Sequence, residues 1–279
     1  MTVSHQARNA DEDPVTAVIP RVPDATPPTP GAGTPAPVEP SPEPAAPAAA
    51  PHLALLRPSG IVTTAAAVVT VLAVAHFAAA VYGIGRPGFQ IPEAIRLGAE
   101  LNVSTWFSSA LHLVNAGLLA LIAANSVRRE RWRWILLSIC CAVVAMDETA
   151  ANHEQVGWII HTTFGTSGLL TYAWIIPAVF LVAVVALLCA PMLLRRPGGL
   201  IVAAGATLFV FGAVGLEAVG GAMFDASGGD GTAFDYVLVS GAEETLEMVG
   251  LVVAMAGLLR MAGGAGLRIA GTFTSASRP

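Results

Sequence analysis

The sequence predicts an all-α protein, a polytopic helical membrane bundle of about six transmembrane helices with both termini in the cytoplasm. Apolar residues make up 54% of the 279 residues and charged residues 12%, where a soluble domain carries about 25% charged residues. Apolar runs recur that approach the roughly 20 residues needed to cross a hydrocarbon core of about 30 Å. Arginines gather between alternate runs, and short loops with this bias stay cytoplasmic.

Six apolar runs define the expected spans. They are residues 61–82, 106–127, 134 to about 151, 172–194, 199–224 and 236–261. The third and sixth runs hold acids near one end, so an alternative interpretation ends these two helices early and leaves the acids in external loops. The segment "LNVSTWF" that opens the second run predicts a capped helix start, with Ser104 or Thr105 as the N-cap.

Arginine positions give the expected orientation, because basic residues in short loops mark the cytoplasmic side. The arginines that precede, separate or follow the runs on this side are Arg57, Arg128, Arg129, Arg131, Arg133, Arg195, Arg196, Arg260 and Arg268. The exception is the first external loop, where Arg86 and Arg96 are accompanied by Glu93 and Glu100. The sequence therefore predicts that the loop after the first run is external.

The two ends of the chain differ in composition from the apolar runs. Residues 1–56 are rich in Pro and Ala and have few large apolar residues, which predicts a disordered cytoplasmic tail. Residues 57–264 form the expected transmembrane domain, and residues 265–279 a flexible C-terminal tail. The start of the chain does not resemble a secretory signal, so we expect the first span to act as an uncleaved targeting element.

Ionisable residues gather at one depth of the predicted bundle. At a rise of about 1.5 Å per residue, the acids and histidines of five runs fall in the outer half of the bilayer. They are Asp147, Glu148, His153 and Glu154 on or after the third run, Glu217 on the fifth, Glu243, Glu244 and Glu247 on the sixth, His76 on the first and His112 on the second. The chain contains no lysine, and no arginine falls at this depth. Protons, a metal ion or a water-filled cavity must therefore accompany the acids, since each buried charge costs about 3 kcal/mol on insertion scales.

The leading hypothesis is a divalent-cation site, because carboxylate oxygen with imidazole nitrogen suits Zn, Mn or Fe. All ten of these residues are candidate ligands. A proton- or cation-coupled transporter is an alternative, as is a metal-dependent membrane hydrolase with a spare glutamate as base. His76 and His112 are also candidate axial ligands of a b-haem electron carrier, although either is equally a candidate core hydrogen-bonding residue. A structural or assembly protein with acids around a water pocket is the last alternative, and enzymatic activity stays open.

Four segments resemble a family of uncharacterised bacterial multi-pass membrane proteins. They are "LNVSTWFSS", "MDETAANHE", "GLEAVGG" and "EETLEMVG", which together cover about residues 101–250. The resemblance implies a shared site without implying a particular chemistry. We expect the protein to lie in the bacterial cytoplasmic membrane as a multi-pass protein. The lipid bilayer is the expected partner and nucleic acid is not, while a homo-oligomer or another membrane partner is left open.

Overall fold

The protein is helical throughout the part that its computed structural model describes, residues 58–86 and 88–264, and no strand occurs there. Five helical segments are long and apolar enough to span a membrane by themselves. They are α1 (Pro58–Gly83), α2 (Val103–Ala124), α5 (Ile175–Leu193), the continuous segment Gly199–Ala226 and α8 (Phe234–Gly264). The pair α3 (Arg128–Ala150) and α4 (Asn152–Phe164) is a bent sixth candidate. The predicted membrane bundle of about six helices is confirmed, while both predicted tails lie outside the described residues.

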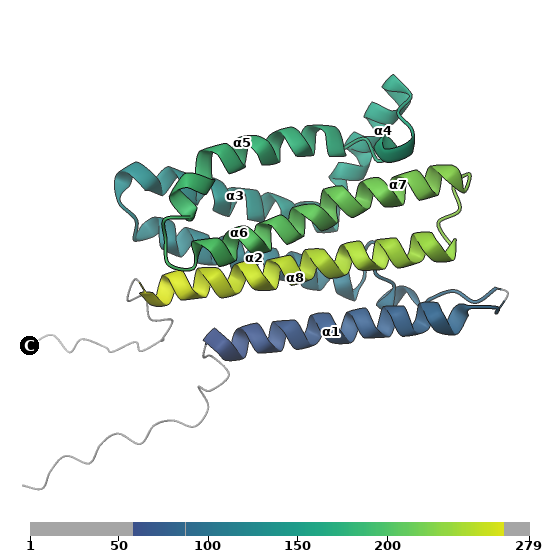
Figure 1. Cartoon of the computed structure of the whole chain (residues 1–279), viewed down its shortest axis with the longest axis horizontal. Coiled ribbons are helices and arrows are strands. Elements are labelled where there is room, and N and C mark those ends of the chain that lie inside the picture. Colours follow the sequence, from purple (N-terminus) through teal and green to yellow (C-terminus); the bar gives the residue numbers. More distant parts are fainter. Residues whose placement is uncertain (1–57, 87, 265–279) are drawn as a thin grey trace, which may run out of the picture. The chain divides into compact units, whose positions relative to one another are not determined.

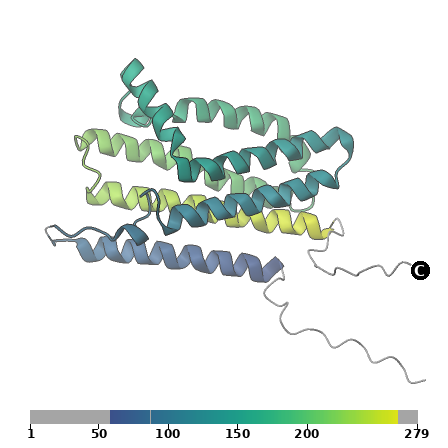
Figure 2. The same ribbon diagram turned by 180° about the vertical axis from the view of Figure 1, so that it is seen from behind.

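The helices pack side by side around α8, which runs through the middle of the bundle (Figure 1). On one side α8 contacts α1. On its other sides it contacts α2 and the span that consists of α6 (Gly199–Val210), the π-helical turn η4 (Phe211–Leu216) and α7 (Glu217–Ala226). The reverse view shows α2 and α3 running side by side (Figure 2), and α5 packs on α3 and α6. Residues of α8 therefore face every helix that carries a predicted site residue, apart from α3 and α4.

Glycines bring the α6 span and α8 into backbone contact. A Cβ at Gly212 in η4 would lie 2.9 Å from Cγ of Glu247 and 3.0 Å from the backbone oxygen of Glu243. A Cβ at Gly250 in α8 would lie 2.5 Å from the backbone nitrogen of Phe209. Small residues at helix crossings let membrane helices approach closely. The acidic face of α8 is consequently held directly against the π-helical turn.

The helix ends settle two sequence-based expectations. The N-cap of α2 is Asn102, whose side chain accepts a hydrogen bond from the backbone N–H of Thr105 at 3.1 Å. The prediction of Ser104 or Thr105 was therefore wrong; their hydroxyls donate to the Asn102 side chain instead. The alternative that leaves the acids in external loops is also wrong for the two acidic helices, because α3 continues through Glu148 to Ala150 and α8 already begins at Phe234, before Glu243.

A sharp bend separates α3 from α4. Ala151 adopts a left-handed conformation with φ of 48°, and the two helices meet at 77°. A left-handed residue ends a helix because it cannot continue the right-handed path. As a result, Asp147 and Glu148 stay on α3 while His153 and Glu154 begin a separate short helix.

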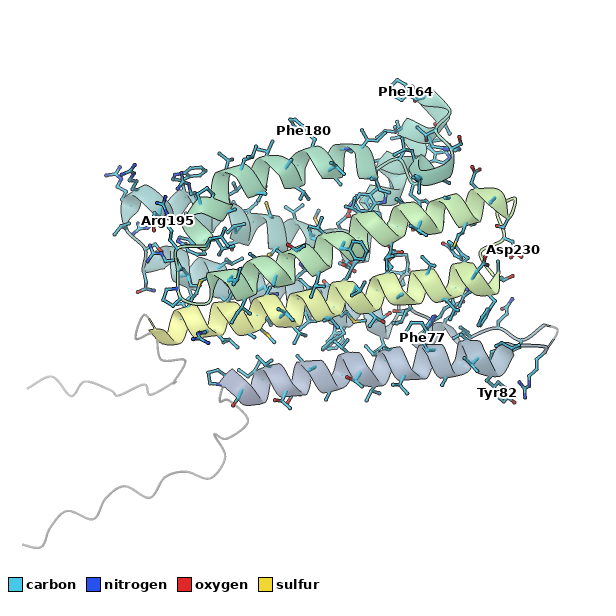
Figure 3. The ribbon with its side chains drawn as sticks, viewed as in Figure 1. Phe77, Tyr82, Phe164, Phe180, Arg195 and Asp230 are labelled. Atoms are coloured by element: carbon cyan, nitrogen blue, oxygen red, sulfur yellow. The ribbon has the colours of Figure 1, made fainter. Side chains whose placement is uncertain are left out.

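The bundle has two chemically different ends. One, which we call the α4 end, consists of α4 and the connections α1–α2 and α7–α8. Figure 3 places Phe164 and Asp230 at this end and Arg195 at the opposite end. The opposite end carries the arginines of the α2–α3 and α5–α6 connections, and the Arg196–Glu130 ion pair joins these connections. The orientation that places the α4 end outside the cell stays a prediction from these arginines.

Candidate functional site

Three potential ligands converge at the α4 end. Glu100 comes from the connection that precedes α2, while His153 and Glu154 come from the first turn of α4. One ligand atom from each residue lies within 4.8 Å of the other two. Glu100 and Glu154 are exposed and His153 is half-buried. We call Glu100, His153 and Glu154 the outer cluster.

Asp147 holds the imidazole of His153 in a defined orientation. Its Oδ2 lies 2.8 Å from Nδ1 of His153, and its Oδ1 accepts from the His153 backbone N–H at 3.2 Å. Because an ionised carboxylate only accepts hydrogen bonds, Nδ1 carries the proton and Nε2 is left with its lone pair. The Trp174 ring packs edge-to-face on the imidazole with 5.0 Å between centroids. This carboxylate–histidine pair is the arrangement that orients metal-ligating histidines in proteins.

Negative charge accumulates around Glu100. Partial burial raises the pKa of its carboxyl group above the usual range, and the neighbouring Glu154 carboxylate raises this pKa further. Asp147 and Glu217 act in the same direction, whereas His153 opposes them. None of these acids forms an ion pair with an arginine in the described part of the chain. A bound cation would relieve the repulsion.

A second group of ionisable residues lies deeper among the spans. His112 of α2 is 2% exposed, and its Nε2 lies 3.8 Å from Oε1 of Glu148 on α3. Glu244 and Glu247 on α8 are both within electrostatic range of Glu148. We call His112, Glu148, Glu244 and Glu247 the inner cluster. Three different helices therefore contribute to it.

Polar atoms at the inner cluster lack partners. Neither ring nitrogen of His112 has a hydrogen-bond partner among residues 58–86 and 88–264. Ser108, one turn earlier on α2, lies near the Glu148 carboxyl, yet its buried hydroxyl makes no well-formed hydrogen bond within the same residues. The His112 ring packs edge-to-face on Phe209, with centroids 5.0 Å apart. Packing fixes this imidazole, but hydrogen bonding does not.

Glu217 and Glu243 form a carboxyl pair beside these clusters. Their carboxyl groups lie close enough to repel one another when both are ionised, and a proton held between them would relieve this repulsion. The indole N–H of Trp174 donates to Oε1 of Glu217 at 3.3 Å. Since Trp174 also packs on His153, this indole joins the carboxyl pair to the outer cluster.

His76 differs from the other predicted ligands because its ring is fully hydrogen-bonded to the backbone. It is fully buried, with 0% exposure. The backbone N–H of Leu97 donates to its Nδ1 at 3.0 Å, and its Nε2 donates to the backbone oxygen of Val237 at 3.3 Å. Both nitrogens are therefore occupied, as expected of a core hydrogen-bonding histidine. The b-haem interpretation loses one of its two axial ligands, and we leave His76 out of the proposed site.

Glu100 is the member of the outer cluster that the sequence analysis did not include among the candidate ligands. The sequence feature that could have identified Glu100 is its position directly before the "LNVSTWFSS" segment. The sequence analysis interpreted Glu100 only as a charged residue of the first external loop. Among the described residues, the outer cluster is the only group with three ligand atoms within 4.8 Å of each other. No other three of the predicted ligands reach this spacing.

Comparison with known proteins places the chain in a family. No curated protein and no solved structure matches the chain. A family model does match, over a range that includes every residue of both clusters and of the carboxyl pair. The expected resemblance to an uncharacterised family of multi-pass membrane proteins is confirmed in part, for the family and for the membrane helices. The chain belongs to the family described as Domain of unknown function (DUF8692), whose model matches residues 62–262.

Proposed function

We propose that this multi-pass membrane protein binds a divalent cation at the outer cluster, with Glu100, His153 and Glu154 as ligands. The observation that carries the proposal is the approach of the three ligand atoms to within 4.8 Å of one another. A set of two carboxylates and one imidazole suits Zn, Mn or Fe, whereas Mg and Ca prefer oxygen ligands alone.

The surroundings of the cluster support this proposal. Asp147 fixes the proton on Nδ1 of His153, so the lone pair of Nε2 is available to an ion. Glu100 and Glu154 are exposed, which gives an ion access from the water at the α4 end. Three protein ligands leave a position for water or a substrate, as in catalytic zinc sites. Hydrolysis by a metal-bound water is compatible with this geometry, and the reaction stays open.

Metal content tests the proposal directly. The detergent-purified protein is treated with a chelator, reloaded with Zn²⁺, Mn²⁺ or Fe²⁺ separately, desalted and measured by mass spectrometry. His153→Ala should bind one ion fewer per chain than the wild type. The matched control is His161→Ala, since His161 also lies on α4 but bonds to Thr166 at 3.2 Å. Equal metal content in His153→Ala and the wild type would contradict the proposal, as would a wild type that binds no metal.

The carboxyl pair favours a second candidate function, proton-coupled transport. Neighbouring acids such as Glu217 and Glu243 can hold one proton between them, and acids inside spans are typical of proton relays. In liposomes containing a pH-sensitive dye, a Zn²⁺ gradient should drive proton movement that Glu243→Gln abolishes. Glu93→Gln is the control, because Glu93 pairs with Arg96 at 3.5 Å in the loop. Absence of any Zn²⁺-driven proton movement in the wild type would exclude this candidate.

A further inference from the structure

We propose that the inner cluster is a second divalent-cation site, in which Nε2 of His112 and the carboxylate of Glu148 bind the ion while the neighbouring Glu244 and Glu247 balance its charge. This site is distinct from the outer cluster in its residues, its helices and its depth. It goes beyond the proposed function and stands or falls separately from it.

In the described part of the chain, His112 lacks the hydrogen-bond partners that a buried imidazole needs. A buried imidazole nitrogen normally finds a hydrogen-bond partner, because leaving a buried polar group unpaired is destabilising. His76 in the same bundle follows this rule with two partners. His112 is 2% exposed, and neither of its nitrogens has a partner among the residues that the structure describes. Its orientation is therefore suited to a ligand that is not a protein group.

The distance between His112 and Glu148 fits two ligands of one ion. The separation of 3.8 Å between Nε2 and Oε1 exceeds the length of a hydrogen bond. Two atoms that each lie about 2.1 Å from one zinc ion are about 3.4 Å apart in tetrahedral geometry, and at most about 4.2 Å apart. The observed separation falls between these values. The pair is thus spaced to bind one ion from two sides.

The negative charge of the inner cluster also favours a bound cation. Glu247 is within electrostatic range of Glu244 and Glu148, and these three carboxyl groups repel one another. None of them is paired with an arginine in the described ranges. Three carboxyl groups inside membrane spans require protons or a cation to neutralise their charge. Because His112 adds a nitrogen ligand, the set suits Zn, Mn or Fe better than Mg or Ca.

Two neighbouring features hold residues of the inner cluster in place. The Phe209 ring packs on His112, which fixes the imidazole plane. Gly212 allows the backbone of η4 to approach Cγ of Glu247, which restricts that side chain. Glu100 of the outer cluster is within electrostatic range of Glu148, Glu244 and Glu247.

The test counts ions per chain in the full-length protein, with Zn²⁺ or Mn²⁺ alone as the probe. The wild type should bind two ions, Glu148→Gln one, His153→Ala one, and the double variant none. Glu148→Gln preserves side-chain shape, and His112→Gln is a second variant that should also bind one ion. Glu130→Gln is the matched control, because Glu130 lies at the opposite end with Arg196. It should bind two ions.

Each outcome decides one of the two sites. If Glu148→Gln and His112→Gln bind as many ions as the wild type, the inner site is refuted while the outer site is unaffected. If His153→Ala alone keeps the full number, the outer site is refuted while the inner site is supported. A wild type without bound metal refutes both. In His153→Ala loaded with Mn²⁺, pulsed electron paramagnetic resonance should detect a coupled nitrogen that His112→Gln removes, and its absence in His153→Ala would also refute the inner site.

Discussion

Replacing Asp147 by Asn tests how the outer cluster prepares His153 for an ion. The substitution keeps the size and shape of the side chain while removing its charge. In the wild type, Asp147 accepts one hydrogen bond from Nδ1 and another from the backbone N–H of His153, at 2.8 and 3.2 Å. An Asn oxygen can replace only one of these acceptors. If it keeps the backbone bond, its NH₂ group faces Nδ1, and the imidazole proton moves to Nε2.

The expected loss of affinity follows from this change of tautomer. A protonated Nε2 cannot bind a metal ion, so binding must first restore the other tautomer and break a hydrogen bond. Loss of such a supporting carboxylate typically weakens metal binding about 10- to 100-fold, which corresponds to about 1.4–2.7 kcal/mol. We expect a weakening of this size for Asp147→Asn, with the number of ions per chain unchanged at saturating metal.

Competition with a fluorescent Zn²⁺ chelator measures this effect. The titration is performed on protein that also carries Glu148→Gln, so that only the outer site is counted. Asp235→Asn is the matched control, because Asp235 is exposed in the first turn of α8. In the described part of the chain, its side chain accepts one hydrogen bond, from the backbone N–H of Tyr236. It should leave the affinity unchanged. An Asp147→Asn affinity within about twofold of the parent would refute the role of this carboxylate.

Four further predictions test the fold and the site. Partial burial raises the pKa of Glu100, so the stability that this group contributes is complete below its ordinary pKa and is lost as the pH rises through the raised value. As the pH falls through this range, the melting temperature of the metal-free protein should therefore rise, while the affinity for Zn²⁺ should fall because protons compete for the carboxylate. The variant Glu100→Gln should flatten both trends. His76→Leu should destabilise the protein by about 2–5 kcal/mol, since two buried backbone groups lose their partner, and an unchanged melting temperature would contradict this. Gly212→Ala should lower the free energy of unfolding by about 1–3 kcal/mol, because the new Cβ would lie 2.9 Å from Cγ of Glu247 on α8. Melting at the wild-type temperature would contradict this close contact between the two helices. A reporter fused after Arg129 should be cytoplasmic and one fused after Gly229 external, and the reverse result would invert the predicted orientation.

The helical class and the end of the bundle that carries the acids were predictable because both depend on local features. Run length and composition decide whether a segment can span a membrane, and a constant rise per residue gives the depth of each acid. The bend at Ala151 was not predictable in this way. Alanine is a strong helix former, so its left-handed conformation must depend on tertiary contacts that no local pattern reveals.

The two buried histidines illustrate the limit for the site. His76 and His112 have the same appearance in sequence, each a single imidazole in an apolar run. In the structure, His76 bonds to the backbone at Leu97 and Val237, whereas His112 faces Glu148 without a partner in the described part of the chain. The difference depends on which segments pack against each ring. Composition and spacing contain no information about those contacts.

The measurement that tests the central claim most directly is a zinc-edge anomalous difference map from crystals of the protein grown with Zn²⁺. The account predicts a peak within about 2.0–2.2 Å of ligand atoms from Glu100, His153 and Glu154. A map with no peak at these residues, in crystals whose zinc is bound elsewhere on the chain, would contradict the proposed cation site.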